Sequence, residues 1–176
     1  NAYAAIANGG RLYLPQLVNS VETLSGETLW NFNRQEIGRA PVSAATLKIL
    51  NNALKGVVNE EGGTGWIARL PGMEVAGKTG TAQVIKLKED APRKKLRDTP
   101  YEQRDHAWFI GYAPADNPEI AVAVIVEHGG FGAESAAPVA REVMRAYLKK
   151  PAAERANRNA EAIHENRDQP CSPPLS

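Results

Sequence analysis

The segment that says most about the fold is VAGKTGTAQV, residues 75–84. Its Val and Thr residues favour a β-strand, which we expect over residues 73–85. Gly77 and Gly80 lie inside this expected strand, although glycine has no side chain to pack and usually weakens a strand. Glycines in such a place are typical of a strand that another backbone or a ligand approaches closely.

Two further strands follow along the chain. Residues 106–112 and 119–127 are joined by Asp116-Asn117-Pro118, which is strong turn chemistry, so we expect an antiparallel hairpin. Apolar residues occupy both faces of residues 119–127. This pattern predicts a central strand that is covered on both sides.

Helices are expected around these strands. Ser43 is placed to cap a helix over Ala44–Asn59, and Ser135 is placed to cap a last helix. We expect their buried stripes to be Leu47, Leu50, Leu54 and Val57 in the first helix and Val139, Val143, Met144 and Tyr147 in the last. Together the elements predict an α+β fold in which an antiparallel sheet is covered by helices.

The N-terminal part adds two small elements. A short helix is expected over Ala2–Ala7, where Gly9 and Gly10 then stop it. Apolar-alternating runs within residues 11–32 flank a turn at Gly26 and predict a β-hairpin. A chain that starts inside a helix leads us to expect that it was cut from something larger.

Two segments look unsuited to a core. Residues 86–105 hold 12 charged residues in 20, which predicts an exposed, mobile insertion. The residues after Lys150 include few large apolar side chains. We therefore expect residues 1–150 to be one incomplete domain and residues 151–176 to be a disordered polar tail.

Composition excludes several classes of function. The chain has 176 residues with a net charge of +1, so no global field attracts nucleic acid or an anionic membrane. The single cysteine, Cys171, excludes an intrachain disulfide and a cysteine-based metal cluster. The longest apolar run, residues 120–126, is far too short to span a bilayer. We expect neither a metal nor a cofactor.

One interpretation of the opening stretch is a phosphate-binding loop. Gly72 and Gly77, followed by Lys78 and Thr79, match its spacing. Such a loop must follow a buried strand and open a helix, because backbone amides at the helix N-terminus hold the phosphates. The broken, polar residues before Gly72 and the β-branched residues after Thr79 do not fit, so this nucleotide-binding alternative is disfavoured.

The other interpretation is Lys78-Thr79-Gly80 as the Lys-Thr-Gly element of serine acyl-transferases, which lies on a strand beside the nucleophile. With VAGKTGTAQV and with HAWFIGYAP at residues 106–114, the chain resembles class B penicillin-binding proteins, most of all the elongation-type penicillin-binding protein 2 of Gram-negative bacteria. The resemblance extends over residues 1–148. It implies the C-terminal part of a transpeptidase domain with a serine β-lactamase-like fold.

The resemblance also implies an activity and its residues. The family's D,D-transpeptidases cross-link peptidoglycan stem peptides by serine acyl transfer and are acylated by β-lactams. Lys78 and Thr81 are the implied catalytic residues, the backbone N–H of Thr81 being one oxyanion donor. Lys78, Thr79, Gly80 and Thr81 are the implied substrate-binding residues, because an extended peptide can pair with the edge of their strand.

The rest of the family's machinery does not occur in the sequence. No serine is followed three residues later by lysine, or two residues later by Asn or Asp. We therefore predict that this chain alone is inactive and cannot form an acyl-enzyme. We also expect residues 119–127 to leave an unpaired strand edge, through which the chain self-associates or binds the remainder of its own domain.

The family further implies a setting. The intact protein would face the periplasm from the bacterial inner membrane, held by an N-terminal helix absent from this chain, and would act with the elongation machinery. A different class of function is a non-catalytic sensor or scaffold that keeps the transpeptidase fold. The intact Lys-Thr-Gly element argues against that alternative.

Other residues have plainer interpretations. His106, His128 and His164 stand alone in the sequence and are expected to be ordinary surface or strand-end histidines. Trp66 and its neighbouring glycines, Gly62, Gly63 and Gly65, either border a substrate groove or form a turn and a core aromatic.

Overall fold

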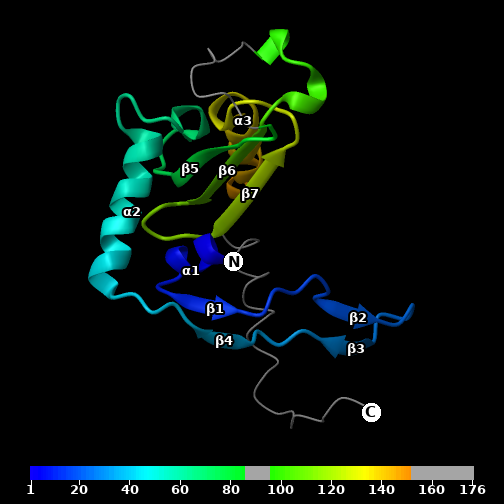
Figure 1. Cartoon of the computed structure of the whole chain (residues 1–176). Coiled ribbons are helices and arrows are strands. Elements are labelled where there is room, and N and C mark those ends of the chain that lie inside the picture. Colours follow the sequence, from blue (N-terminus) through cyan, green and yellow to red (C-terminus); the bar gives the residue numbers. More distant parts are fainter. Residues whose placement is uncertain (86–95, 152–176) are drawn as a thin grey trace.

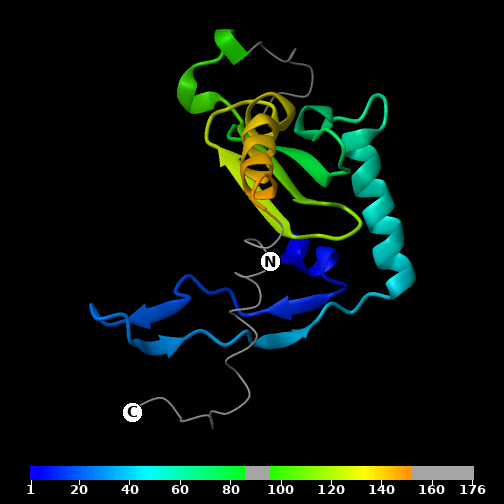
Figure 2. The ribbon, with the colours of Figure 1, turned by 180° about the vertical axis from the view of Figure 1, so that it is seen from behind.

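The computed structural model describes residues 1–85 and 96–151, and its centre is an antiparallel sheet of three strands. The strands are β5 (Ala76–Ala82), β6 (His106–Ala113) and β7 (Ile120–Val126), in the order β5-β6-β7. Helix α3 (Gly132–Leu148) lies across one face of this sheet, as seen from behind in Figure 2. Helix α2 (Ala44–Asn59) stands beside β5 (Figure 1). The predicted α+β fold with a helix-covered antiparallel sheet is confirmed.

The register of the sheet is regular from end to end. Lys78 lies opposite Ile110, and Gly80 lies opposite Trp108. The predicted hairpin of β6 and β7 is confirmed, with Ile110 opposite Ala123. An uninterrupted ladder makes β5 a rigid support for the side chains that it carries.

The core lies between this sheet and α3. Its largest fully buried side chains include Phe109 on β6 and Met144 on α3, together with Val58 and Val75. The other buried residues of α3 are Gly132, Ala136, Ala137 and Ala140. Alanines allow the helix axis to lie close to the sheet, because small side chains need little room.

The expected start of α3 was wrong, and its expected buried stripe was right for Met144, partly right for the half-buried Tyr147 and wrong for the two valines. The helix begins at Gly132 after Phe131, and Ser135 lies inside it, donating a hydrogen bond from Oγ to the Gly129 carbonyl at 2.6 Å. Val139 and Val143 are each 46% exposed, whereas Met144 is buried as expected. The stripe was predicted from the spacing of the larger apolar residues, but apart from Met144 the helix presents its small residues to the sheet.

The bounds of α2 and its cap are confirmed. The Ser43 Oγ accepts a hydrogen bond from the Thr46 backbone N–H at 3.1 Å. Its stripe is only partly covered, however, since Leu54 packs against a small buried cluster around Tyr112 while Leu50 is 37% exposed. The half of α2 nearest its C-terminus therefore holds it to the rest of the chain, and Val58 is its one fully buried residue.

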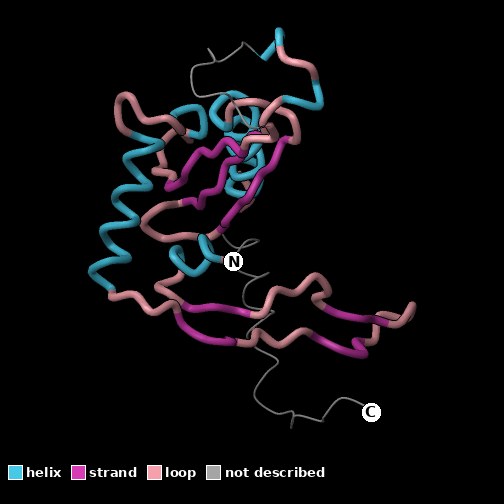
Figure 3. The backbone as a smooth tube through the Cα atoms, viewed as in Figure 1, coloured by secondary structure: helices cyan, strands magenta, loops and turns pink. Residues whose placement is uncertain are grey.

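The N-terminal part forms an extended arm (Figure 3). After α1 (Ala2–Ala7), β2 (Ser20–Glu22) and β3 (Thr28–Asn31) make the predicted hairpin, with Gly26 at a φ of +85° in its turn. Nearer the sheet, β1 (Arg11–Tyr13) pairs with β4 (Glu36–Arg39), a strand that the sequence did not lead us to expect. The hairpin is therefore the outer end of a longer two-stranded arm.

The prediction that β7 is central and covered on both sides was wrong for the part of the chain described, whereas the predicted unpaired strand edge of residues 119–127 is confirmed there. There β7 is an edge strand, and only its face towards α3 is partly buried. Ala121, Ala123 and Ile125 on the other face are exposed. An apolar pattern shows which faces a strand can bury, but it does not place the covering element within the same chain.

Part of the expected insertion is ordered. Residues 96–105 include two short 3₁₀ helices, η2 (Leu96–Asp98) and η3 (Tyr101–Gln103). The Asp105 carbonyl accepts a hydrogen bond from the Gly130 N–H at 2.8 Å, which ties this segment to the loop before α3. The rest of the insertion, residues 86–95, and the expected tail from residue 152 onward lie outside the described residues.

Candidate active site

The four residues predicted to bind substrate gather at one hollow. Lys78, Thr79, Gly80 and Thr81 line it from β5, with Thr64 from a loop and with the first residues of α3. Its cavity volume is about 560 Å³. Lys78 and Thr81 are exposed and Thr79 is half-buried, so their polar atoms can be reached from solvent.

The outer edge of β5 has no strand beside it in the described part of the chain. Cross-strand pairing puts Thr79 opposite Phe109, on the face that α3 covers, and Lys78 opposite Ile110, on the other face. The Lys78 side chain returns around the edge, since its Nζ donates to the Thr79 carbonyl at 2.9 Å and to the Thr79 Oγ1 at 3.4 Å. An open edge with polar groups on both sides can accept an extended peptide as an added strand.

The two glycines of this stretch have different surroundings. A Cβ at Gly77 would lie 2.5 Å from Cζ of Phe109, and Gly77 is buried, so its missing side chain makes room for a core ring. Gly80 lines the hollow and is half-buried. The expectation that both glycines clear space for a peptide was therefore wrong for Gly77.

The missing side chain of Gly132 lets α3 approach β5 at Gly80. A Cβ on Gly132, the first residue of α3, would overlap the backbone oxygens of Gly80 and Trp108. The helix thus begins directly on the strand that carries Lys78, and Phe131 and Glu134 join the lining of the hollow. Sequence reasoning missed this contact because Gly132 and Gly80 are far apart in the chain.

The Gly-rich loop after α2 borders the hollow through one residue. Thr64 lies in the lining, and its Oγ1 is 3.0 Å from the Oγ1 of Thr79. Gly65 is buried, and Trp66 is 58% exposed outside the lining. The sequence analysis singled out this loop for its glycines and for Trp66. It did not predict that the Thr64 hydroxyl is the group that reaches the hollow.

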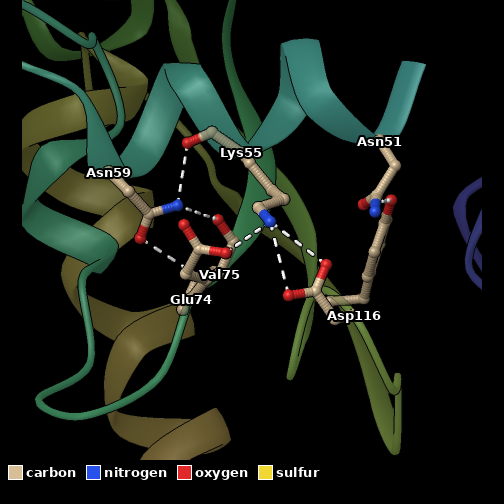
Figure 4. Close-up of polar contacts among 7 residues, drawn as sticks. Asn51, Lys55, Asn59, Glu74, Val75 and Asp116 are labelled. Carbon is tan, nitrogen blue, oxygen red and sulfur yellow. Dashed lines mark hydrogen bonds and ion pairs between the residues drawn. The ribbon is translucent and has the colours of Figure 1, made fainter. Parts of the chain in front are cut away.

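A polar cluster fixes the start of β5 (Figure 4). Lys55 on α2 forms ion pairs with Glu74, just before β5, and with Asp116 in the turn after β6 at 3.1 Å. Hydrogen bonds to Glu74 and then to Asp116 raise the pKa of Lys55. Asn59 donates from Nδ2 to the Lys55 carbonyl at 2.8 Å and to the Val75 carbonyl at 2.7 Å. Three separate segments are thereby joined at one point.

Tyr112 adds a second link between α2 and the sheet. Its hydroxyl donates to Oδ1 of Asn51 at 2.8 Å. Figure 4 shows Asn51 on α2, the helix that also carries Lys55. Burial raises the pKa of Tyr112, and the nearby Tyr3 adds to the effect. The phenol is therefore held in its neutral form beside a cluster of apolar side chains.

The described histidines lie outside the lining of the hollow. The His128 backbone N–H donates to Nδ1 of His106 at 2.9 Å, and the two ring centroids are 4.7 Å apart. The Tyr101 ring packs against His128 in a tilted arrangement, with the ring centroids 4.6 Å apart. These contacts support the expectation of strand-end histidines for both residues, while His164 lies outside the described residues.

The structure contradicts the nucleotide-binding alternative. Lys78 sits in the middle of an antiparallel strand that runs on to Ala82, and no helix opens at Thr79. Within residues 1–85 and 96–151, His, Cys, Asp and Glu side chains form no group of three suited to a metal ion. No helix in the same residues has the length and apolar character to cross a membrane.

Comparison with known proteins agrees with this geometry. The family model described as the penicillin binding protein transpeptidase domain matches residues 1–145. The chain belongs to this family. This penicillin-binding protein chain is 37% identical over 154 residues to the peptidoglycan D,D-transpeptidase MrdA of Haemophilus influenzae, and 35% identical over 154 residues to the peptidoglycan D,D-transpeptidase PbpA of Mycolicibacterium smegmatis.

Solved structures of penicillin-binding proteins share the fold. Penicillin-binding protein A of Mycobacterium tuberculosis, as a ceftriaxone acyl-enzyme complex, has a TM-score of 0.65 and 35% identity over 84% of this chain and 31% of its own. Penicillin-binding protein 2 of Pseudomonas aeruginosa has a TM-score of 0.57 and 33% identity over 84% and 28%.

The alignments also define how much of its relatives this chain represents. They cover 85% of the chain but 23% of the Haemophilus influenzae protein, and 84% of the chain but 28% of the Mycolicibacterium smegmatis protein. The chain thus spans about a quarter of the length of these curated relatives.

Proposed function

We propose that this chain forms the Lys-Thr-Gly wall of the active site of a peptidoglycan D,D-transpeptidase, which cross-links stem peptides by serine acyl transfer and is acylated by β-lactams. The observation that carries the proposal is the hollow at the open edge of β5, where Lys78, Thr79, Gly80 and Thr81 come together. The curated relatives bear the same activity in their names.

Each residue has a physical role in this proposal. A stem peptide lies along the edge of β5 and gains main-chain hydrogen bonds. The Lys78 ammonium and the hydroxyls of Thr79 and Thr81 attract and hold a carboxylate, since charge-assisted hydrogen bonds are the strong ones. The Thr81 backbone N–H stabilises the oxyanion, and losing such a donor costs roughly 10²- to 10³-fold in rate.

The nucleophile comes from another part of the domain in this proposal. The sequence has no Ser-x-x-Lys element, so the chain alone is inactive. Its partners are the stem peptide, β-lactams, the remainder of its own transpeptidase domain and, in the intact protein, the elongation machinery. The intact protein is anchored to the inner membrane and faces the periplasm. The net charge of +1 of this chain gives it no general attraction for nucleic acid, so no nucleic-acid partner is proposed.

A covalent label tests the proposal. The assembled domain, meaning this chain together with the segment that carries Ser-x-x-Lys, is incubated with a fluorescent penicillin, and so is the chain alone. We expect stoichiometric labelling of the assembled domain and none of the chain alone. We expect Lys78→Met to slow labelling of the assembled domain by at least about 10²-fold. An assembled domain that takes up no label would favour the sensor or scaffold alternative.

A further inference from the structure

Thr64 is a hydroxyl at the hollow that the proposed function has not used. It lies in the loop between α2 and η1 (Trp66–Ala68), and its Oγ1 lies 3.0 Å from the Oγ1 of Thr79. Both hydroxyls line the same hollow as Lys78. Although the two threonines are 15 positions apart in the sequence, their side chains meet at the open edge of β5.

The loop holds this hydroxyl in a defined place. The Gly65 N–H donates to the Val57 carbonyl at 2.9 Å, and a Cβ on Gly63 would overlap the same carbonyl, so the loop lies directly on the last turn of α2. Exposed loop residues usually move more than the elements they join. Here the close backbone approach fixes the residues on both sides of Thr64.

Arg69 adds a second anchor for this loop. Its Nε donates to the Val58 carbonyl at 2.7 Å, and its Nη2 donates to the carbonyls of Asn59 at 2.8 Å and Glu60 at 2.7 Å. These are carbonyls at the end of α2 that have no partner within the helix. One guanidinium therefore ties the segment after the loop to the end of α2.

The hydrogen bonds to the Thr79 hydroxyl determine which way its proton can point. A hydroxyl has one proton to donate and two lone pairs to accept. The Lys78 ammonium can only donate, so it occupies one lone pair of the Thr79 Oγ1. If Thr64 donates to the second lone pair, the proton of Thr79 is left free to point into the hollow.

We propose that Thr64 is a positioning residue for carboxylate recognition, because it directs the proton of the Thr79 hydroxyl towards a bound carboxylate. The inference rests on the proposed function and names the group of the ligand that this hydroxyl pair serves. A carboxylate accepts and cannot donate, so a ligand carboxylate selects the arrangement in which Thr64 and Lys78 donate to Thr79. An uncharged ester at the same place provides a weaker acceptor and less selection.

The test measures β-lactam acylation of the assembled domain. Thr64→Val keeps the side-chain shape and removes the hydroxyl, Thr64→Ser keeps the hydroxyl, and Thr28→Val on the exposed strand β3 is the matched control. For a penicillin with a free carboxylate we expect Thr64→Val to weaken the initial non-covalent complex roughly fivefold to tenfold. We expect Thr64→Ser to restore binding, Thr28→Val to have no effect, and the penicillin ester to bind all four proteins alike.

A double-mutant cycle separates this role from a merely structural one. If Thr64 acts through Thr79, adding Thr64→Val to Thr79→Val causes no further loss of affinity. A wild-type affinity in Thr64→Val, an equal effect on the ester, or full additivity with Thr79→Val would each overturn the inference. Thr64→Ala, read in the same assay, gives a second variant without the hydroxyl.

The two proposals fail in different ways. A wild-type domain that no β-lactam acylates contradicts the proposed function and takes this inference with it. A wild-type domain that is acylated while Thr64→Val binds the free carboxylate normally contradicts the inference alone.

Discussion

Gly132 shows how much of this site depends on a single missing methyl group. Its backbone begins α3 on top of Gly80, where no side chain intervenes. Lys78, Thr79, Gly80 and Thr81 could be predicted from their order in the sequence, because they form one short strand motif. Gly132 and Thr64 could not, because their importance comes from contacts with residues distant in the chain.

A pair of glycine substitutions tests this contact. In Gly132→Ala the new methyl group overlaps the backbone of Gly80 and Trp108, so we expect a loss of about 1–3 kcal/mol in the free energy of unfolding. In Gly56→Ala, inside α2, the new group meets only the flexible carboxylate end of Glu60 at 3.1 Å. Helix propensity then predicts a gain of about 0.5–1 kcal/mol. Urea denaturation of the two variants measures the difference, and equal stabilities would contradict it.

Stability and function should change together at Gly132. The methyl group moves α3 or β5, and both elements line the hollow. In the assembled domain we expect Gly132→Ala to be acylated at least about tenfold more slowly by a penicillin, since small misplacements of catalytic groups are costly. Gly56→Ala, which lies outside the lining, should be acylated at the wild-type rate. Stopped-flow acylation rates for both variants check this, and a wild-type rate in Gly132→Ala would show that the contact serves packing only.

At the scale of elements, the sequence located the helices and strands better than it oriented them. The bounds of α2 follow from the Ser43 cap and from the Gly-rich stop, which are local signals. The face of α3 depends on what the sheet offers, and a sheet with Phe109 in its centre accepts the alanines and turns Val139 outward. Local pattern sets where an element lies, while packing sets which face it buries.

The cluster at Lys55 gives a pH dependence at this scale. Its pKa is raised above the ordinary lysine value in the folded chain by hydrogen bonds to Glu74 and Asp116, so the folded state holds the proton more tightly than the unfolded state. This contribution to stability is complete below the ordinary lysine pKa and is lost as the pH rises through the higher folded pKa. We expect Lys55→Met to be less stable than the wild type at neutral pH.

The gap between Lys55→Met and the wild type should narrow as the pH rises above about 10.4, the ordinary lysine pKa. Thermal unfolding from neutral to strongly alkaline pH measures it. Lys48→Met, also on α2 but with an exposed side chain, is the control and should follow the wild type throughout. A gap of constant size across this range would show that the Lys55 charge is not involved. The pKa of Tyr112 is raised in the wild type and in both variants alike. Its contribution to the pH dependence of stability therefore cancels when a variant is compared with the wild type.

At the scale of the whole molecule, the described residues leave large apolar surfaces open. Ile125 on the outer face of β7 is 45% exposed, and Leu24 at the tip of the arm is fully exposed. An apolar strand with a free edge is a site for pairing with another chain. The apolar pattern of β7 was correct as a statement about what it can bury, and the structure shows that its outer face is uncovered here.

We expect the chain alone to self-associate through β7, and a charge on that strand should prevent it. Ile125→Lys puts an ammonium beside the edge, which discourages pairing of strands. Leu24→Lys puts the same charge on the arm, where it should leave association unchanged. Multi-angle light scattering at several concentrations should show oligomers for the wild type and Leu24→Lys and a monomer for Ile125→Lys. If Leu24→Lys dissociates the oligomer instead, the arm is the contact between chains. A wild-type chain that is monomeric at every concentration would contradict the predicted self-association.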